Sequence, residues 1–259
     1  MAEESFVILN DVLITGVQSI NFSTDETQDS KLLLNATGIN RKITSPPKTQ
    51  CNISKLLVNK DFIKTITGLT DISGQFIHNG SALDFNSATI SSYRFFVNNS
   101  TAPKIDFSLE IYGDLKTGEP KDLNLMTAES GIVGVDTTGF GINLDNNNNF
   151  VQSLGYNVTF NVMPTYQIDS IKSSTVKILP PTTYEANAVF EFNDQTLENV
   201  TGLLDNETFN RTISFQITGN DGTELCNFEV PSASLKTQSI SQSASSTEQI
   251  TLSFVGYGT

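Results

Sequence analysis

Several segments of the chain alternate apolar and polar residues with the two-residue period of a β-strand. Residues 105–111 read Ile-Asp-Phe-Ser-Leu-Glu-Ile, and the segments 156–162 and 184–192 alternate in the same way. A strand with this pattern has one apolar face and one polar face. Because an apolar sheet face has to be covered by a second sheet or by a helix, the pattern predicts layered β-domains.

The sequence also contains an internal repeat, and a long repeat defines the architecture of a chain. Adding 134 to the residue number takes Val17-Gln-Ser to Val151-Gln-Ser, and Thr67-Gly-Leu to Thr201-Gly-Leu. One insertion in the second copy, between Asp205 and Ser232, raises this offset from 134 to 145, and the larger offset takes Tyr112-Gly to Tyr257-Gly. The repeat therefore predicts a duplicated domain.

The repeat sets the expected domain boundaries. We expect a first β-sandwich domain at residues 1–113, a connector at 114–139 and a second β-sandwich domain at 140–259. The connector contains Pro120 and several glycines, which is typical of a turn-rich segment at the surface. The alternative is a packed arm that contacts a neighbouring subunit.

Each copy contains one candidate for a short flanking helix at the matching place. Asn59 and Asn193 are suited to cap the start of a helix, and Gly68 and Gly202 are suited to the left-handed residue after its end. Apolar residues three positions apart between these caps predict one apolar face. The threonine-rich sequence of both segments leaves a strand as the alternative. The expected fold class is mainly β, with two tandem sandwich domains that each carry a short helix.

Composition and charge restrict the class of function. The chain is 37% hydrophobic and 17% charged, which predicts a packed core, and its net charge is −13. An acidic chain is unsuited to holding nucleic acid through phosphate contacts. The acidic start and the lack of an apolar run of about 20 residues predict neither a secretion signal nor a membrane span. Cys51 and Cys226 are expected to be two buried thiols.

The residue types that catalysis needs are scarce. His78 is the only histidine and precedes an Asn-Gly pair, so we interpret it as a turn residue. The chain has no phosphate-binding loop and no nucleophile elbow, and Asp145 with four asparagines lacks the glycine and glutamate of a calcium loop. Two acidic residues that converge for sugar hydrolysis remain open. We expect no catalytic, cofactor-binding or metal-binding residues, and the protein is not expected to be an enzyme.

Two segments carry a family resemblance. Residues 14–22, Ile-Thr-Gly-Val-Gln-Ser-Ile-Asn-Phe, and residues 229–236, Glu-Val-Pro-Ser-Ala-Ser-Leu-Lys, resemble the opening and the close of tail tube proteins of long-tailed phages. The resemblance implies a β-sandwich with a flanking helix, six of which form a ring whose inner strands close into a barrel around a channel. Some members of that family fuse two tube domains, so that three subunits make a pseudo-hexameric ring.

This resemblance implies a major tail tube subunit of the virion, made in the host cytoplasm. Its partners would be other copies of itself, the terminator, tip or baseplate proteins, and a sheath in a contractile tail. Genomic DNA would pass through the channel without specific binding, and acidic side chains of both copies are expected to line it. Exposed sheet edges would be paired by ring closure. The segments 24–48 and 163–182 are expected to be arms that reach the next ring.

Two other classes of function stay open. The first is another ring of the same tail, such as a terminator, tip or baseplate protein, with the same fold but few copies per virion. The second is a tandem β-sandwich module that attaches to a host glycan. Tyr93, Phe95 and Phe96 are the aromatic cluster that would suit such attachment, and buried strand residues are the alternative interpretation.

Overall fold

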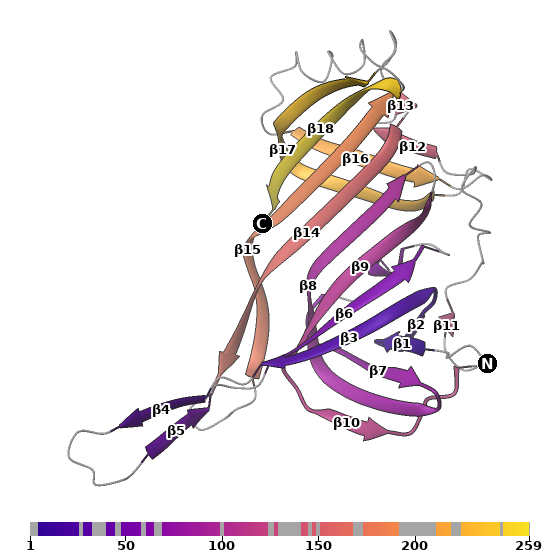
Figure 1. The fold of residues 1–259 in the computed structure, drawn as a ribbon. Coiled ribbons are helices and arrows are strands. Elements are labelled where there is room, and N and C mark those ends of the chain that lie inside the picture. Colours follow the sequence, from indigo (N-terminus) through magenta and orange to yellow (C-terminus); the bar gives the residue numbers. More distant parts are fainter. Residues whose placement is uncertain are drawn as a thin grey trace.

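The computed structural model shows a mainly β chain (Figure 1). It describes residues 5–25, 28–32, 40–44, 48–57, 61–64, 69–98, 101–123, 127–128, 141–144, 147–148, 151–167, 173–191, 211–218, 224–243 and 246–258. The strands of the first half are β1 (Ser5–Leu9), β2 (Val12–Ile14), β3 (Val17–Asp25), β4 (Gln28–Leu32), β5 (Asn40–Thr44), β6 (Lys48–Leu56), β7 (Ile72–His78), β8 (Ser81–Asn98) and β9 (Thr101–Ile111). They are followed by β10 (Leu115–Gly118), β11 (Thr127–Ala128), β12 (Gly141–Leu144), β13 (Asn147–Asn148), β14 (Val151–Tyr166), β15 (Ser173–Glu191), β16 (Arg211–Thr218), β17 (Glu224–Ser243) and β18 (Ser246–Gly258).

One antiparallel series of strands runs through the molecule, in the order β3-β6-β9-β8-β14-β15-β18-β17. We call this series the long sheet. Its first four strands come from the first half of the chain and its last four from the second half. The two halves meet where β8 pairs with β14, so that hydrogen bonding continues from one half into the other (Figure 1).

The long strands β8 and β17 leave the long sheet and pair with other strands at their N-terminal ends. The start of β8 pairs with β7 and β10, and the start of β17 pairs with β16. Ser87 and Ser232 have positive φ angles of 56° and 46° at these departures. A positive φ is uncommon for a residue with a side chain, so it marks a local bend in each strand.

The core lies on one face of the long sheet. Ile105, Phe107, Leu109 and Ile111 of β9 are buried, as the alternating pattern predicts. One continuous cluster of buried side chains contains residues of both halves, among them Ile53, Phe95, Tyr156 and Phe228, together with Val7 and Leu9 of β1. Burial of this apolar area contributes roughly 25 cal/mol per Å², and it holds the two halves together as one body.

The Asn-Gly pair at 79–80 makes the turn between β7 and β8. Asn79 and Gly80 have φ angles of 48° and 76°, which is the left-handed conformation that a two-residue hairpin turn requires. In the second half, β16 ends at Thr218 and β17 begins at Glu224. The corresponding hairpin therefore has a longer connection, and part of the extra length of the second copy lies there.

The strand predictions are confirmed at the coarse level, because the chain is mainly β with one large antiparallel sheet. All four predicted helix-cap residues, Asn59, Gly68, Asn193 and Gly202, lie outside the described residues. Between the first pair, the structure describes only a short 3₁₀ turn, Phe62–Lys64. The amide of Ile63 in this turn is bonded to Asp61 Oδ1 at 3.2 Å.

The described parts of the connector pack against the first half of the chain. The strand β10 pairs with β8, and β11 runs parallel to β2. Gln75 holds this segment, since its Nε2 donates to the carbonyl of Glu119 at 2.9 Å and its Oε1 accepts from the amide of Lys121 at 2.8 Å. No helix in the described ranges is long and apolar enough to span a bilayer.

Two extensions project from the long sheet. The hairpin β4–β5 and the far ends of β14 and β15 reach away from the body toward the same lower corner of Figure 1. The described strands of these extensions lie within the segments 24–48 and 163–182. Met163 and Tyr166 on the second extension are 53% and 36% exposed, which leaves apolar surface available for contact.

Candidate functional site

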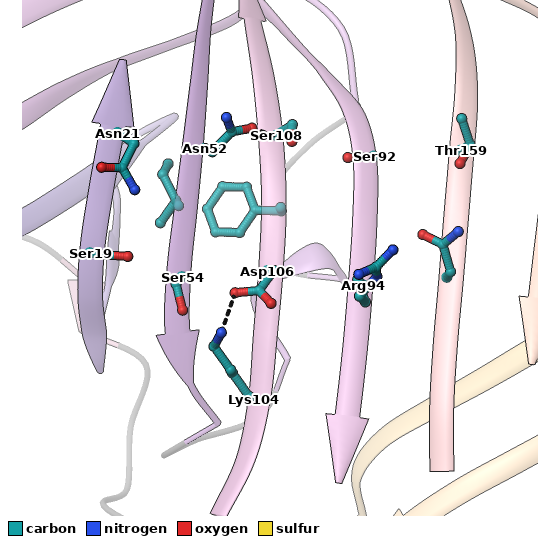
Figure 2. Close-up of a pocket in the computed structure, with 13 residues that line it drawn as sticks. Ser19, Asn21, Asn52, Ser54, Ser92, Arg94, Lys104, Asp106, Ser108 and Thr159 are labelled. Carbon is teal, nitrogen blue, oxygen red and sulfur yellow. Dashed lines mark hydrogen bonds and ion pairs between the residues drawn. The ribbon is translucent and has the colours of Figure 1, made fainter. Parts of the chain in front are cut away.

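The face of the long sheet opposite the core is lined by small polar side chains. Figure 2 shows part of it, where side chains from β3, β6, β9, β8 and β14 stand side by side. The residues that line the shallow hollow here are Ser19, Asn21, Asn52, Ile53, Ser54, Ser92, Arg94, Lys104, Asp106, Phe107, Ser108, Asn157 and Thr159. We call this surface the polar face. Strand alternation produces it, since each of these polar residues is next to a residue that enters the core.

Hydrogen bonds and ion pairs connect neighbouring side chains across the polar face. Ser108 Oγ donates to Asn52 Oδ1 at 2.7 Å, and Lys104 Nζ lies 3.1 Å from an oxygen of Asp106 (Figure 2). Exposed interactions of this kind each contribute about 0–1 kcal/mol to stability. Their main effect is to fix the side chains of a smooth polar surface.

The charges on the polar face are balanced. Outside the projecting ends of β14 and β15, strand alternation and pairing place five acidic and four basic residues on the described part of this face: Asp25, Asp106, Glu110, Glu185, Glu191, Lys48, Arg94, Lys104 and Lys236. Lys48 lies 2.7 Å from Glu110, and Lys236 lies 3.7 Å from Glu185. The face carries mostly uncharged Ser, Thr, Asn and Gln, and the three lysines named here each lie beside a carboxylate.

The joint between the two halves lies under this face. Along it, residues 92–98 of β8 pair with residues 153–159 of β14. On the core side, the ring of Phe228 lies 4.6 Å from that of Tyr156 and 4.8 Å from that of Phe95, measured between centroids. Tyr156 Oη also donates to the carbonyl of Glu229 at 2.9 Å. Aromatic side chains of both halves therefore pack against one another across the joint.

A buried polar group also lies at the joint. Tyr93 Oη donates to Asp61 Oδ2 at 2.8 Å, and the amide of Asp61 is bonded to the carbonyl of Leu225 at 3.0 Å. Burial, and then the neighbouring carboxylate of Asp61, raise the pKa of Tyr93 well above its usual value. Lys55 Nζ lies 5.1 Å from the centre of the Phe62 ring. The segment 61–64 is thus fixed between the two halves.

The long sheet ends in two edges. In the part of the chain that the structure describes, residues 19–25 of β3 pair on one side only, with β6, and residues 237–243 of β17 pair only with β18. Phe22 on β3 is 43% exposed and Ile240 on β17 is 57% exposed. Both edge segments are more polar than a central strand such as β9, because Ile240 is the one large apolar residue of 237–243 and only Ile20 and Phe22 are apolar in 19–25.

The residues that stood out in the sequence, His78, the two cysteines and the aromatic cluster of β8, lie within strands of the fold. His78 ends β7, where its Nδ1 is 2.9 Å from Ser5 Oγ. Cys51 and Cys226 are buried and free, as predicted, and burial raises the pKa of the Cys51 thiol to about 12. Among Tyr93, Phe95 and Phe96, the first two are buried and only Phe96 is exposed, at 44%. Asp145 lies outside the described residues, and the described ones contain no group of potential metal ligands.

No protein-family model matches this chain, and no curated protein matches its sequence.

Proposed function

We propose that this chain is a structural subunit of a phage tail tube, with two tandem sandwich domains that each contribute one half of the long sheet. The observation that carries the proposal is the long sheet itself, which in its described part has one face of mainly uncharged polar side chains and ends in two edges that pair on one side only. Such a sheet is suited to continue into other copies of itself.

Open edges are the physical reason for assembly. A strand that pairs on one side presents a row of free amide and carbonyl groups, which pair with another strand when one is available. Closing the sheet into a ring removes the edges entirely. Three chains with two domains each would give a pseudo-hexameric ring, and stacked rings would give a tube. The subunit would then be made in the host cytoplasm and reside in the virion.

The polar face would line the channel of this tube. DNA is held by clusters of Lys and Arg that release counterions from the phosphates. The polar face has few such groups, and most of its lysines lie beside carboxylates, as Lys48 does beside Glu110. A lining of hydroxyls and amides with a slight excess of acidic groups would let genomic DNA pass without specific binding.

The two projecting extensions would connect stacked rings. They leave the long sheet at the same end, and the second carries the exposed side chains of Met163 and Tyr166. Deleting residues 28–44 should leave folded chains and rings but no long tubes. Normal tubes from this variant would show that the first extension is not needed to connect stacked rings.

Electron microscopy of the purified protein tests the proposal directly. Negatively stained samples at rising protein concentration should show rings of uniform diameter and then tubes. A protein that stays monomeric at every concentration, as judged by light scattering on the same samples, would contradict the proposal.

The same fold would also suit another ring of the same tail, such as a terminator, tip or baseplate protein. The two roles differ in copy number, which the band intensity of virion proteins on a gel measures. A host-binding module is the remaining alternative, and the exposed ring of Phe96 is the feature that favours it. Binding of soluble glycans that is lost in Phe96→Ala would support that alternative.

A further inference from the structure

The joint inside the chain has a defined register that the two outer edges can reproduce. In the joint, Tyr156 lies opposite Phe95 and Ser153 lies opposite Asn98. We propose that residues 237–243 of β17 pair antiparallel with residues 19–25 of β3 in a second copy of this chain, in the register that places Ile240 opposite Phe22. This inference rests on the proposed function and specifies the contact between subunits.

The first support is that β17 is the structural counterpart of β8 in the second copy. The β8–β9 pairing has bulges between Ile90 and Ser92 and between Phe96 and Asn98. The β17–β18 pairing has bulges between Leu235 and Thr237 and between Ser241 and Ser243. Each residue number in the second pair equals its counterpart plus 145, which is the larger offset of the sequence repeat. The positive φ angles at Ser87 and Ser232 obey the same offset.

The second support is that β3 is the counterpart of β14 in the first copy, at the smaller offset of the repeat. Both strands begin with Val-Gln-Ser, at Val17 and Val151. Both also pair with the strand that occupies the same place in the sheet, since β3 pairs with β6 and β14 with β15. Because bulges fix the position of a strand in a sheet, these matches define which residues are equivalent.

Applying both offsets to the joint gives the register between subunits. The joint pair Tyr156 and Phe95 becomes Phe22 and Ile240, and the joint pair Asn157 and Arg94 becomes Ser23 and Ser239. A slip by one residue would turn the apolar side chains of one strand to the polar face. The register is therefore determined by the requirement that the apolar side chains of both strands lie on the core side of the sheet.

Burial at the two places supports this register independently. Tyr156 is 5% exposed and Phe95 is fully buried in the joint, whereas their counterparts Phe22 and Ile240 are 43% and 57% exposed. Phe22 also lines a hollow with Ile20, Phe76 and Leu83 at the β3 edge. Phe22 packs edge-on against Phe76 of its own chain, with 4.9 Å between ring centroids. Two large apolar side chains are thus left partly exposed at the positions that the joint buries, and a second copy would cover what remains exposed.

The other side chains at the edges are more polar than those in the joint. Gln238 stands at the position of the buried Tyr93, and Thr24 stands at the position of the buried Val158. An edge that must stay in solution before assembly requires such polar residues. The contact between subunits should therefore be weaker than the joint inside the chain, and it should form at high protein concentration.

Disulfide cross-linking tests the register. The double variants Ser23→Cys/Ser239→Cys and Thr24→Cys/Gln238→Cys place a thiol of one subunit directly opposite a thiol of the next. Because neighbouring pairs of an antiparallel ladder alternate, one variant tests a hydrogen-bonded pair and the other a non-hydrogen-bonded pair. In the control Ser19→Cys/Ser239→Cys, the thiols are four residues out of register, which separates them by roughly 13 Å along the strand. The native Cys51 and Cys226 are buried. Oxidation of the unsubstituted protein measures the cross-linking that these two thiols cause by themselves.

Mild oxidation of assembled samples should link at least one opposite pair into dimers and trimers on a non-reducing gel, at ten times the control yield or more. Tubes by microscopy together with preferential linking of the control would overturn the register while leaving the proposed function intact. Tubes in which no pair links above background would also overturn the register. The absence of any assembly would overturn both.

Discussion

Tyr93 donates a hydrogen bond to Asp61 at 2.8 Å in a site where both side chains are almost fully buried. Tyr93 belongs to β8, and Asp61 begins the short segment that contacts Leu225 of β17 through its backbone. This bond therefore links the first half of the chain to the second. Its environment raises the pKa of Tyr93, so that the phenol keeps its proton to a higher pH than an exposed tyrosine would.

Removing this donor should destabilise the whole chain. In Tyr93→Phe, Asp61 loses a buried partner while the ring is kept, which should lower the free energy of unfolding by about 1–3 kcal/mol. Urea unfolding followed by circular dichroism measures the change. The matched control is Tyr257→Phe, because Tyr257 is 57% exposed and its substitution should change stability by less than about 0.5 kcal/mol. Equal effects of both variants would contradict the role of the bond.

The aromatic contacts of Phe228 should dominate the stability of the joint. Phe228→Ala removes the ring that lies against Tyr93, Phe95 and Tyr156, and should cost about 3–5 kcal/mol. Phe96→Ala is the control on the opposite face, where the ring is 44% exposed. The two halves should unfold in one transition in the unsubstituted protein because they share one core. Two separate transitions in that protein would show that the joint is weak.

Gly74 occupies a place with no room for a side chain. A Cβ atom there would lie 2.1 Å from the carbonyl oxygen of Ile8 and 2.6 Å from the ring of Phe85. Gly74→Ala should therefore destabilise the chain by about 1–3 kcal/mol or prevent its folding. Gly155→Ala is the control, since its nearest neighbour would be Phe96 at 3.9 Å, an ordinary contact. Thermal unfolding midpoints of the two variants test the difference.

Stability should fall at alkaline pH. Burial raises the pKa of Cys51 to about 12 from the ordinary value of 9.0, so the folded state holds the thiol proton more tightly than the unfolded state does. The resulting stability is fully present below pH 9 and is lost as the pH rises toward 12. Unfolding in urea at pH 7, 9 and 10.5 should show this decline, and Cys51→Ala should show a smaller one. If the free energy of unfolding falls equally steeply with pH in Cys51→Ala, the decline arises from the buried tyrosines instead.

Assembly should depend on the exposed edge residue Ile240. Ile240→Asp adds a charge where the second copy would cover an apolar side chain, so the protein concentration needed for tubes should rise about tenfold or more. The monomer should keep its stability, because Ile240 is 57% exposed. Phe96→Asp, which lies away from both edges, is the matched variant and should assemble normally. Sedimentation at a series of concentrations measures both.

The alternation of residues was sufficient to predict parts of the strands β9, β14 and β15 and the side of each that faces the core. Segment 105–111 forms β9 with the expected residues inside, and Asn79-Gly80 forms the expected turn. These features are local, since period and turn chemistry are written in adjacent residues. The burial of Cys51 and Cys226 was predictable for a similar reason, because two distant thiols in an apolar context tend to enter the core.

The arrangement of strands was not predictable in the same way. Nothing in the residues of β8 or β14 indicates that they pair with each other, because cross-strand neighbours far apart in sequence depend on the complete fold. The charge of a single face could not be derived from the composition, because net charge is a sum over the entire chain. Many acidic residues lie elsewhere, so the composition of one face differs from the average.

The contrast between the aromatic joint and the polar edges has a mechanical consequence. If the subunits assemble into rings as proposed, two kinds of strand contact alternate around each ring. The joint inside each chain is rich in buried aromatic side chains, whereas the contact between subunits relies mainly on backbone hydrogen bonds and has a single large apolar pair. Force on the wall would open the second kind first, because it buries less apolar surface. Damage would then release whole chains, each still folded and able to re-enter the wall.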